Sequence, residues 1–259
     1  DALSTGHTYS LVSGTGSTDN ASFAISGSNL VTNADFNFEV KNSYSIRIRT
    51  TDAGGNYEEA FTITIVDINE APVITSNGGI AASISYAENT TSTVITVTST
   101  DVDASSTATY SISGTDADDF TIGSSSGILT FSSTPNFEVP TDSNGDNVYV
   151  VIVTVTDNGS LTDTQTITVT VTDVNEAPVI TSNSGGDTAS ISYVENATSS
   201  VTTVTSTDVD GSSTATYSKS GTDADDFAIN STSGVLTFSS SPNFEVPTNS
   251  NGDNQYVVI

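Results

Sequence analysis

The sequence predicts an all-β protein made of β-sandwich domains in tandem, and three observations lead to this prediction. Strand-length runs alternate Val or Ile with Thr, as in 149–155 and 164–171, which is the pattern of half-buried antiparallel strands. Gly, Asn and Asp separate the runs at positions typical of turns, and no stretch has a helical period. The sequence also repeats itself with a period of roughly 107 residues, close to the size of one sandwich domain.

The repeat is clearest between 72–152 and 178–259. Within it, Tyr86-Ala87-Glu88-Asn89 returns as Tyr193-Val194-Glu195-Asn196. A divergent copy precedes them, in which Asn37-Phe38-Glu39 matches Asn136-Phe137-Glu138. We therefore predict three domains, which are a partial repeat at 1–71 that lacks its first strand or strands, a complete repeat at 72–177, and a partial repeat at 178–259 that lacks its last strands.

Partial repeats leave sheet edges with unpaired backbone groups. Two interpretations account for them. The sequence is a segment of a longer array, or the end of one chain completes the beginning of the next by strand addition.

Within the complete repeat, short apolar runs predict the strands in order. We expect 73–76 and 83–86 to form one strand with a break. Further strands are expected at 94–98, 109–112, 120–122, 128–131, 149–155 and 164–171. The aromatic residues Phe120, Phe131, Phe137 and Tyr149 recur at positions expected for a sandwich core.

The chain is strongly acidic, with 31 Asp and Glu residues against 4 Lys and Arg residues and a formal net charge of -27. This imbalance argues against nucleic-acid binding and against anionic membranes, and it favours cations as partners. The absence of Cys excludes a disulfide framework, and no apolar run is long enough to cross a bilayer.

Two acidic connectors, at 67–72 and 173–178, join consecutive repeats. Their sequences are Asp-Ile-Asn-Glu-Ala-Pro and Asp-Val-Asn-Glu-Ala-Pro. Pro fixes its own φ and favours an extended conformation in the preceding residue, so the connector is expected to be stiff. The side-chain oxygens of Asp67, Asn69 and Glu70, and of their counterparts in the second connector, are ligands suited to Ca²⁺ and not to Zn²⁺ or copper.

The motifs of the chain, taken in order, resemble the cadherin repeat. They are Tyr-x-Glu-Asn at Glu88 and Glu195, Asp-x-Asp at 101–103 and 208–210, Asn-Phe-Glu at 136–138, Asp-x-Gly at 157–159, and the two connectors. The Thr, Ser and Asn bias and the Asn-Glu-Ala-Pro form are most similar to cadherin-like arrays of large secreted bacterial adhesins. That resemblance implies an extracellular or cell-surface location.

The resemblance further implies immunoglobulin-like Greek-key sandwiches joined end to end, with Ca²⁺ at each junction. It assigns to the junction between the first two repeats Asn37, Glu39, Asn69, Glu70, Asp101, Asp103 and Asp157. It assigns to the next junction Glu88, Asn136, Glu138, Asn175, Glu176, Asp208 and Asp210. Asp67 and Asp173 are placed in or beside these sites. Asp1 and Asp52 would serve a preceding junction, and Glu195, Asn243 and Glu245 a following one. Asn at 37, 136 and 243 stands where the family usually has an acid, so each junction has one charge fewer.

Other polar motifs have simpler interpretations. We predict a polar hairpin loop at 142–147, although its oxygens at alternate positions leave an additional ion site open. The acidic run 116–119 is expected to be a turn or a helical-turn cap. His7, the only His, has no pattern of catalytic partners around it.

These observations predict a non-enzymatic extender whose calcium-stiffened repeats project a binding module from a bacterial surface or build a fibre. Its partners would be calcium ions, neighbouring repeats and other copies of the chain. One alternative is an adhesion module that binds a glycan or another copy of itself. Another is a filament protomer joined by strand exchange. An enzyme is disfavoured, because acidic clusters that recur with the domain period are typical of structural ion sites.

Overall fold

The computed structural model describes residues 6–211 and 214–259, so the predicted ligand Asp1 lies outside the described residues. Within them the secondary structure consists of β-strands and short 3₁₀ turns of three or four residues. The all-β prediction is confirmed. No helix in this part of the chain has the length and apolar character needed to span a membrane.

The chain divides into two compact units. The first holds the residues up to Tyr86 together with Thr91–Thr134 and Thr141–Thr170. The second holds Ala87–Thr90, Pro135–Pro140 and Val171–Ile259. Two loops and the last residues of the second repeat thus group with the third repeat. The three domains and their bounds remain a prediction that is based on the sequence repeat.

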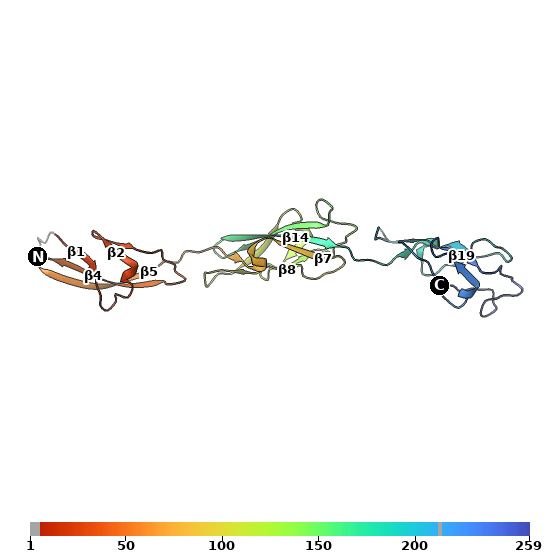
Figure 1. Cartoon of the computed structure of the whole chain (residues 1–259), viewed down its shortest axis with the longest axis horizontal. Helices are drawn as coiled ribbons and strands as arrows, with labels where there is room; N and C mark the ends of the chain where they lie inside the picture. The colour runs from red at the N-terminus through yellow and green to blue at the C-terminus, as the bar shows by residue number, and fades with distance from the viewer. Residues whose placement is uncertain (1–5, 212–213) are drawn as a thin grey trace. The chain divides into compact units, whose positions relative to one another are not determined.

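The complete repeat contains a four-stranded sheet in the order β10-β13-β14-β7, with β14 and β7 as neighbours (Figure 1). These strands are Thr109–Ser113, Val148–Thr156, Thr162–Thr172 and Ala82–Ala87. A second sheet has the order β11-β12-β8, formed by Phe120–Ile122, Ile128–Phe131 and Ile95–Thr96. The strand β6 (Val73–Ile74) pairs with β9 (Ser99–Thr100). Non-consecutive neighbours of this kind are the mark of Greek-key connections.

Alternation along β13 and β14 builds the core of this repeat. Every second residue is buried from Tyr149 to Val155 and from Gln165 to Val171. The residues between them, which are Val, Ile and Thr on β13 and Thr on β14, are at most half-buried. The inward residues are Tyr149, Val151, Val153 and Val155 on β13 and Gln165, Ile167, Val169 and Val171 on β14. The ring of Phe131 packs 4.5 Å from that of Phe120 and 5.1 Å from that of Tyr149. The predicted core positions of Phe120 and Tyr149 are confirmed.

The prediction of one interrupted strand over 73–76 and 83–86 is wrong. The segments form β6 and β7, which belong to different sheets. The turn η2 (Ser76–Gly79) separates them, with Asn77 in the left-handed region at φ 48°. Gln165 of β14 stabilises this crossing, because its Nε2 donates to the carbonyl oxygens of Ser76 and Ile80 at 2.8 and 2.6 Å. Within the expected strand at 94–98 only Ile95–Thr96 (β8) forms a strand, and β9 lies just beyond it.

The first repeat has a sheet in the order β1-β4-β5 and a hairpin of β2 and β3. Their bounds are Thr8–Leu11, Phe23–Ser26, Asn29–Thr32, Ser43–Asp52 and Gly55–Thr64, for β1 to β5. Phe23, Tyr44 and Ile46 form its buried core. By sequence alignment these strands correspond to β10 to β14, and the described residues of this repeat contain no counterpart of β6 to β9.

The third repeat contains a different set of strands, which shares with the first repeat only the counterparts of β11 and β12. They are β15 (Val179–Ile180), β16 (Thr202–Thr203), β17 (Ser206–Thr207), β18 (Phe227–Ile229) and β19 (Val235–Phe238). They correspond to β6, β8, β9, β11 and β12. The segments that align with β7, β10 and β13 are not strands among the described residues. In the second repeat β13 and β7 are the neighbours of β14, and β10 pairs with β13. No residues of the sequence align with β14.

Candidate metal centre

Four carboxylates converge in the first unit, at Glu39, Asp67, Glu70 and Asp103. Each offers an oxygen that lies within 4.8 Å of the corresponding oxygens of the other three. They come from three places in the chain: Glu39 follows β3, Asp67 and Glu70 follow β5, and Asp103 follows β9. Glu39, Glu70 and Asp103, which were assigned to one junction, are therefore close together with Asp67 in this unit.

Hydrogen bonds fix the orientation of this group. The backbone N–H of Glu70 donates to Oδ2 of Asp103 at 3.0 Å, and the backbone N–H of Asp103 donates to Oδ1 of Asp101 at 3.0 Å. Ser106 Oγ donates to Asp101 Oδ2 at 2.6 Å, and this bond, followed by the backbone N–H of Asp103, lowers the pKa of Asp101. Asp103 Oδ1 is buried and accepts no hydrogen bond. It is thus an acceptor that is available to a cation.

Asn69 joins the connector to the last turn of the second repeat. Its Nδ2 donates to Asp157 Oδ2 at 2.7 Å, and Leu161 N donates to Asp157 Oδ1 at 2.8 Å. A Cβ at Gly159 would lie 2.5 Å from the Asn69 side chain, so glycine is required for this approach. The repeated Asp-x-Gly motif therefore positions the connector, and the oxygens of Asp157 are already engaged by these donors.

A second group of carboxylates converges in the second unit, at Glu88, Glu138, Asp173 and Glu176. Their oxygens also lie within 4.8 Å of one another. The backbone N–H of Glu176 donates to Oδ2 of Asp210 at 2.8 Å, as that of Glu70 does to Asp103. The backbone N–H of Asp210 in turn donates to Asp208 Oδ1 at 3.1 Å. The predicted convergence of Glu138, Glu176 and Asp210 is therefore found.

Glu88 is the most deeply buried member of the group, with a side chain that is only 1% exposed. Its Oε2 accepts from the backbone N–H of Phe137 and its Oε1 from that of Val174, each at 2.8 Å. Its own N–H donates to the carbonyl of Thr172 at 3.1 Å. Glu88 thus fastens the 135–140 loop and the connector to the end of β7, and it brings their acids together.

The electrostatics of the group are unfavourable without a cation. Burial raises the pKa of Glu138, Asp173 and Glu176, and neighbouring carboxylates, including Asp210, raise each pKa further. The pKa of Glu70 in the first group is raised in the same way, by burial first and then by Glu39 and Asp103. Carboxylates whose pKa rises for these reasons favour a proton or a metal ion over the free anion.

No Lys or Arg in the described part of the chain forms a salt bridge with these groups. Lys41 pairs with Asp19, and both Arg47 and Arg49 pair with Glu58. Lys219 donates to the carbonyl of Ala224. Two carboxylate oxygens of the second group, Glu138 Oε2 and Glu176 Oε2, are buried without a hydrogen-bond donor, and so is Oδ1 of the adjacent Asp210. Clustered acids with such oxygens are suited to hold a cation.

The predicted Asn ligands have other partners. Oδ1 of Asn37 accepts from Val40 N at 2.8 Å, and Oδ1 of Asn136 accepts from Val139 N at 2.7 Å. Each Asn therefore closes its own turn. Asn175 Nδ2 donates to the carbonyl of Glu176 at 2.8 Å. Their assignment as ligands remains a prediction.

The predicted ligands of the outer junctions are also engaged in local hydrogen bonds. Asp52 Oδ1 accepts from the N–H groups of Gly54 and Gly55. Glu195 Oε2 accepts from Phe244 N at 3.0 Å, which matches the bond between Glu88 and Phe137. Asn243 Oδ1 accepts from the N–H of Glu245 at 2.9 Å. The roles of these residues in metal binding likewise remain predictions.

Sequence reasoning missed Asn89 as part of the second group. Its Nδ2 donates to Glu176 Oε1, and its N–H donates to the carbonyl of Pro135 at 3.0 Å. Asn89 has a left-handed backbone at φ 58°, a conformation that Asn tolerates, and Asn196 has the same value. The recurrence of Asn after Glu in Tyr-x-Glu-Asn was the available signal.

The acids at 116 and 142–147 serve a different purpose. Asp142 accepts from the N–H groups of Asp146 and Asn147 at 2.9 and 3.1 Å, which closes the hairpin loop. Asp116 precedes the helical turn η3 (Ala117–Asp119), as predicted, but it does not cap that turn. Its Oδ1 accepts from Ser143 N at 2.9 Å and its Oδ2 from Val150 N at 2.7 Å. The carboxylate therefore joins the loop to β13.

Asp116→Asn is expected to lower the free energy of unfolding by about 2 kcal/mol, because the NH₂ of the buried amide would face one of the two part-buried N–H donors. Urea unfolding and amide exchange at Ser143 and Val150 measure the effect. Burial raises the pKa of Asp116, but the bonds from Val150 and Ser143 outweigh it and lower the pKa overall. The contribution is thus present above about pH 4 and is lost as the pH falls through the folded-state pKa. Asp118→Asn, at an exposed position of the same turn, is the control. Equal losses in the two variants would contradict this role.

Comparison with known proteins finds similarity to one class of domain. Residues 82–172, most of the complete repeat, match the family model of the cadherin domain. Human CDH23 EC21-23 has 22% identity and a TM-score of 0.63, with 92% of this chain and 80% of that chain covered. Mouse Cadherin-23 EC22-24 has 22% identity and a TM-score of 0.57, with 92% and 77% covered.

A protocadherin gammaB7 EC3-6 cis-dimer structure has 19% identity and a TM-score of 0.56, with 92% of this chain and 61% of that chain covered. Similarity at such identities shows the fold. No curated protein matches the chain. The family match and the structural neighbours together support a cadherin-like repeat array.

Proposed function

We propose that the chain is a calcium-stiffened extender segment of an extracellular adhesin or fibre. The observation that carries this proposal is the pair of acidic groups, one at each connector, whose buried oxygens lack hydrogen-bond donors. The composition and the connector form make a secreted bacterial adhesin the parent that we favour. The proposed ligands are the members of the two groups together with Asp101, Asp208 and Asp210.

Calcium fits these groups better than other biological cations. The donors are carboxylate oxygens, without His or Cys, in numbers that a flexible oxygen-coordinated site needs. Two like charges at 4 Å repel by about 4 kcal/mol at an effective dielectric constant of 20. A bound Ca²⁺ would supply the positive charge that offsets this repulsion. The residues of the chain do the rest: Glu88 fastens two loops, and the N–H groups of Glu70 and Glu176 hold Asp103 and Asp210 in place.

This arrangement supports a role in stiffening. The connector contributes Asp173 and Glu176, the preceding repeat contributes Glu88 and Glu138, and the following repeat contributes Asp210. Ligands from both sides of a connector that share one cation restrict its motion, whereas unneutralised ligands favour separation. The junction is therefore expected to be flexible without calcium and stiff with it.

Small-angle scattering with and without calcium tests this proposal. Chelation is expected to broaden the distribution of interatomic distances, because flexible connectors populate bent conformations as well as extended ones. Mg²⁺ at the same concentration is the control, since it requires a tighter octahedral site and is expected to restore the calcium-bound profile poorly. Identical profiles in calcium and in chelator would contradict a stiffening role.

A further inference from the structure

Asparagine residues that precede glycine are prone to deamidation, in which the glycine nitrogen attacks the asparagine side chain. Glycine favours the attack because it has no side chain to hinder it. The chain has four such pairs, which begin at Asn77, Asn144, Asn158 and Asn251. All four Asn residues are exposed to solvent, so exposure does not distinguish them. The hydrogen bonds around each pair do distinguish them.

In three of the pairs, the backbone N–H of the glycine donates to the carbonyl oxygen three residues earlier. These bonds run from Gly78 to Thr75, from Gly145 to Asp142 and from Gly252 to Asn249, with N···O distances of 3.2, 3.3 and 3.2 Å. The glycine nitrogen must leave this bond before it can react with the side chain beside it. The turn therefore protects each of these three asparagines.

The side chains of Asn144 and Asn251 are held as well. Asn144 Nδ2 donates to Asp146 Oδ2 at 3.0 Å, and Asn251 Nδ2 donates to Asp253 Oδ2 at 2.9 Å. Reorientation of either amide toward the following nitrogen would break a hydrogen bond to a charged group, which is among the stronger kinds.

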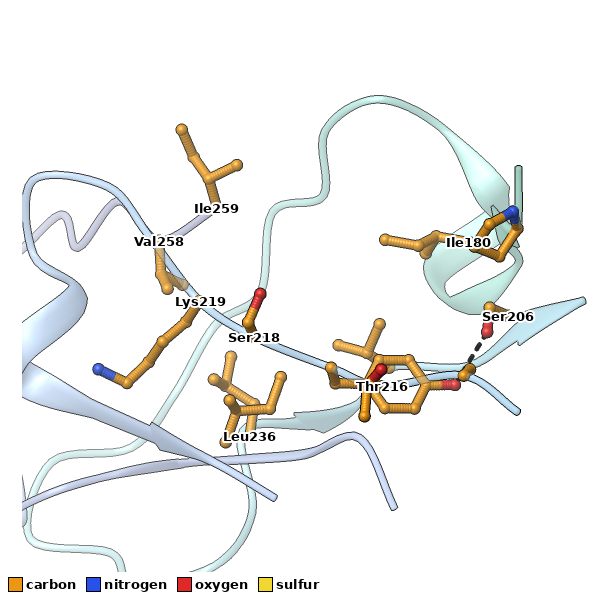
Figure 2. Close-up of a pocket in the computed structure, with 13 residues that line it drawn as sticks. Ile180, Ser206, Thr216, Ser218, Lys219, Leu236, Val258 and Ile259 are labelled. Carbon is orange, nitrogen blue, oxygen red and sulfur yellow. Dashed lines mark hydrogen bonds between the residues drawn. The ribbon is translucent and has the colours of Figure 1, made fainter. Parts of the chain in front are cut away.

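The loop that contains Asn251 is also fastened at both ends. Asp223 Oδ1 accepts from Ser250 N at 2.8 Å, and its Oδ2 accepts from Val257 N at 2.7 Å. Beyond this loop the chain reaches an apolar pocket of the third repeat, which Ile259 lines (Figure 2). Asp116 fastens the loop that contains Asn144 in the same way.

The pair Asn158-Gly159 lacks these restraints. In the part of the chain that the structure describes, neither the Gly159 N–H nor the Asn158 side chain forms a hydrogen bond. The flanking residues close this turn: Ser160 N donates to the carbonyl oxygen of Asp157 at 3.3 Å, and Asp157 N donates to that of Leu161 at 3.0 Å. Both reacting groups are therefore free within a turn that is itself well defined.

We propose that Asn158 is a modification site, at which the chain deamidates spontaneously to aspartate and isoaspartate. The nitrogen of Gly159 bonds to Cγ of Asn158 and ammonia leaves, which gives a cyclic succinimide. Water then opens the ring. Cleavage of the new bond between nitrogen and Cγ gives aspartate, and cleavage of the original peptide bond gives isoaspartate. The chain gains one water and loses one ammonia, so the reaction requires no oxidant, cofactor or enzyme.

The isoaspartate product is expected to loosen the connector. Its main chain runs through Cβ and Cγ of residue 158, so one additional carbon separates Asp157 from Gly159. The turn has no room for this displacement, because even a Cβ at Gly159 would lie 2.5 Å from the Asn69 side chain. Asp157 accepts the hydrogen bonds from Asn69 and Leu161, and both bonds are expected to weaken. This effect does not depend on calcium.

The first test follows deamidation in the whole protein, kept in a warm, mildly alkaline buffer that contains chelator, by peptide mapping with mass spectrometry. Asn158 is expected to react at least about fivefold faster than each of the other three asparagines, since the loss of one hydrogen bond slows a step by about that factor. In concentrated guanidinium chloride the four sites are expected to react at similar rates, because unfolding removes the protective bonds. The chain thus supplies its own controls.

The second test measures the effect on the connector, by NMR of the aged protein in chelator. Hydrogen exchange at the Leu161 N–H is expected to be at least about fivefold faster in molecules with isoaspartate at 158, and the side-chain amide resonances of Asn69 are expected to shift. Treatment with an isoaspartate methyltransferase and its methyl donor, which converts isoaspartate to aspartate, is expected to restore the slow exchange.

Two variants separate the additional carbon from the additional charge. Asn158→Asp introduces the charge alone, and its exchange at Leu161 is expected to match that of the unmodified protein. Asn158→Ala cannot deamidate and is expected to keep slow exchange after the same incubation. Alanine is compatible with this turn, because Ala53 occupies the equivalent position in the first repeat.

Four results would overturn the proposal. Equal rates at the four sites of the folded protein, or an Asn158 that stays intact while the unfolded chain reacts, would remove the assignment of this site. Unchanged exchange at Leu161 in protein with isoaspartate at 158 would remove the effect on the connector. Faster exchange in incubated Asn158→Ala would assign the loosening to damage elsewhere in the chain.

Discussion

Calcium added to the metal-free protein at neutral pH is expected to raise its melting temperature by about 10 °C. A ligand that binds the folded state alone stabilises it by about 2.7 kcal/mol at a concentration 100 times its dissociation constant. In a domain of about 100 residues, each kcal/mol corresponds to roughly 4 °C or more. Differential scanning calorimetry across a calcium titration measures the shift, and a melting temperature independent of calcium would contradict the proposed sites.

The effect of Glu138→Gln on the melting temperature is expected to depend on whether calcium is present. Glu138→Gln removes one of the crowded carboxylates, so in chelator the variant is expected to melt at the same temperature as the unchanged protein or above it. In calcium it loses a ligand, so its calcium-dependent gain is expected to be smaller. Glu59→Gln, at an exposed site on β5, is the control and should leave both values unchanged. A variant that melts lower in chelator would show that Glu138 stabilises the metal-free fold by other contacts.

The dependence on pH follows from the same carboxylates. The pKa values of Glu138, Asp173 and Glu176 are raised in the folded state, by burial and then by their neighbours. A raised pKa means that the folded state binds more protons, so without metal the contribution of these groups to stability is lost as the pH rises through that pKa. Protons and calcium therefore compete, and the calcium-dependent gain is expected to be smaller near pH 5 than at pH 7.

Local patterns made much of the fold predictable. Alternation of apolar residues with Thr marks the buried face of β14, whereas β13 is apolar at most positions and only its burial alternates. Both strands lie where the sequence predicts them. Membership of a sheet is a long-range property. The sequence 73–86 therefore gave no sign that β6 and β7 separate, because the bonds from Gln165 that stabilise the crossing come from more than 80 residues away.

The candidate site was predictable in a different way. The order of the acidic motifs, and their resemblance to a known repeat, placed Glu138, Glu176 and Asp210 together. The hydrogen bonds that hold the group together were not predictable, since the N–H donors to Glu88 lie 49 and 86 residues away along the chain. Asp116 shows the same limit. Its acidic run indicated a turn, but its carboxylate accepts hydrogen bonds from Ser143 in the 142–147 loop and from Val150 of β13.

Glu88→Gln is expected to be the most damaging single substitution among the acidic residues. Both oxygens of Glu88 accept backbone N–H groups, and a glutamine can supply only one acceptor oxygen there. One of the two part-buried N–H groups then faces the NH₂ of the buried side chain, at a cost of about 2 to 3 kcal/mol, which corresponds to a fall of roughly 10 °C in melting temperature. The loss is expected in chelator and in calcium, because it arises from hydrogen bonds and not from the metal.

Glu195→Gln supplies the matched comparison, because Glu195 occupies the equivalent position in the third repeat. It makes the corresponding bond to Phe244 but is exposed to solvent, so water can replace what the amide removes, and the change is expected to stay within about 0.5 kcal/mol. Thermal melting of both variants in chelator, followed by the same measurement in calcium, separates the two contributions of Glu88. Equal losses in Glu88→Gln and Glu195→Gln would mean that burial at the connector does not determine the role of this residue. A loss seen only in calcium would assign Glu88 to the metal and not to the fastening of the loops.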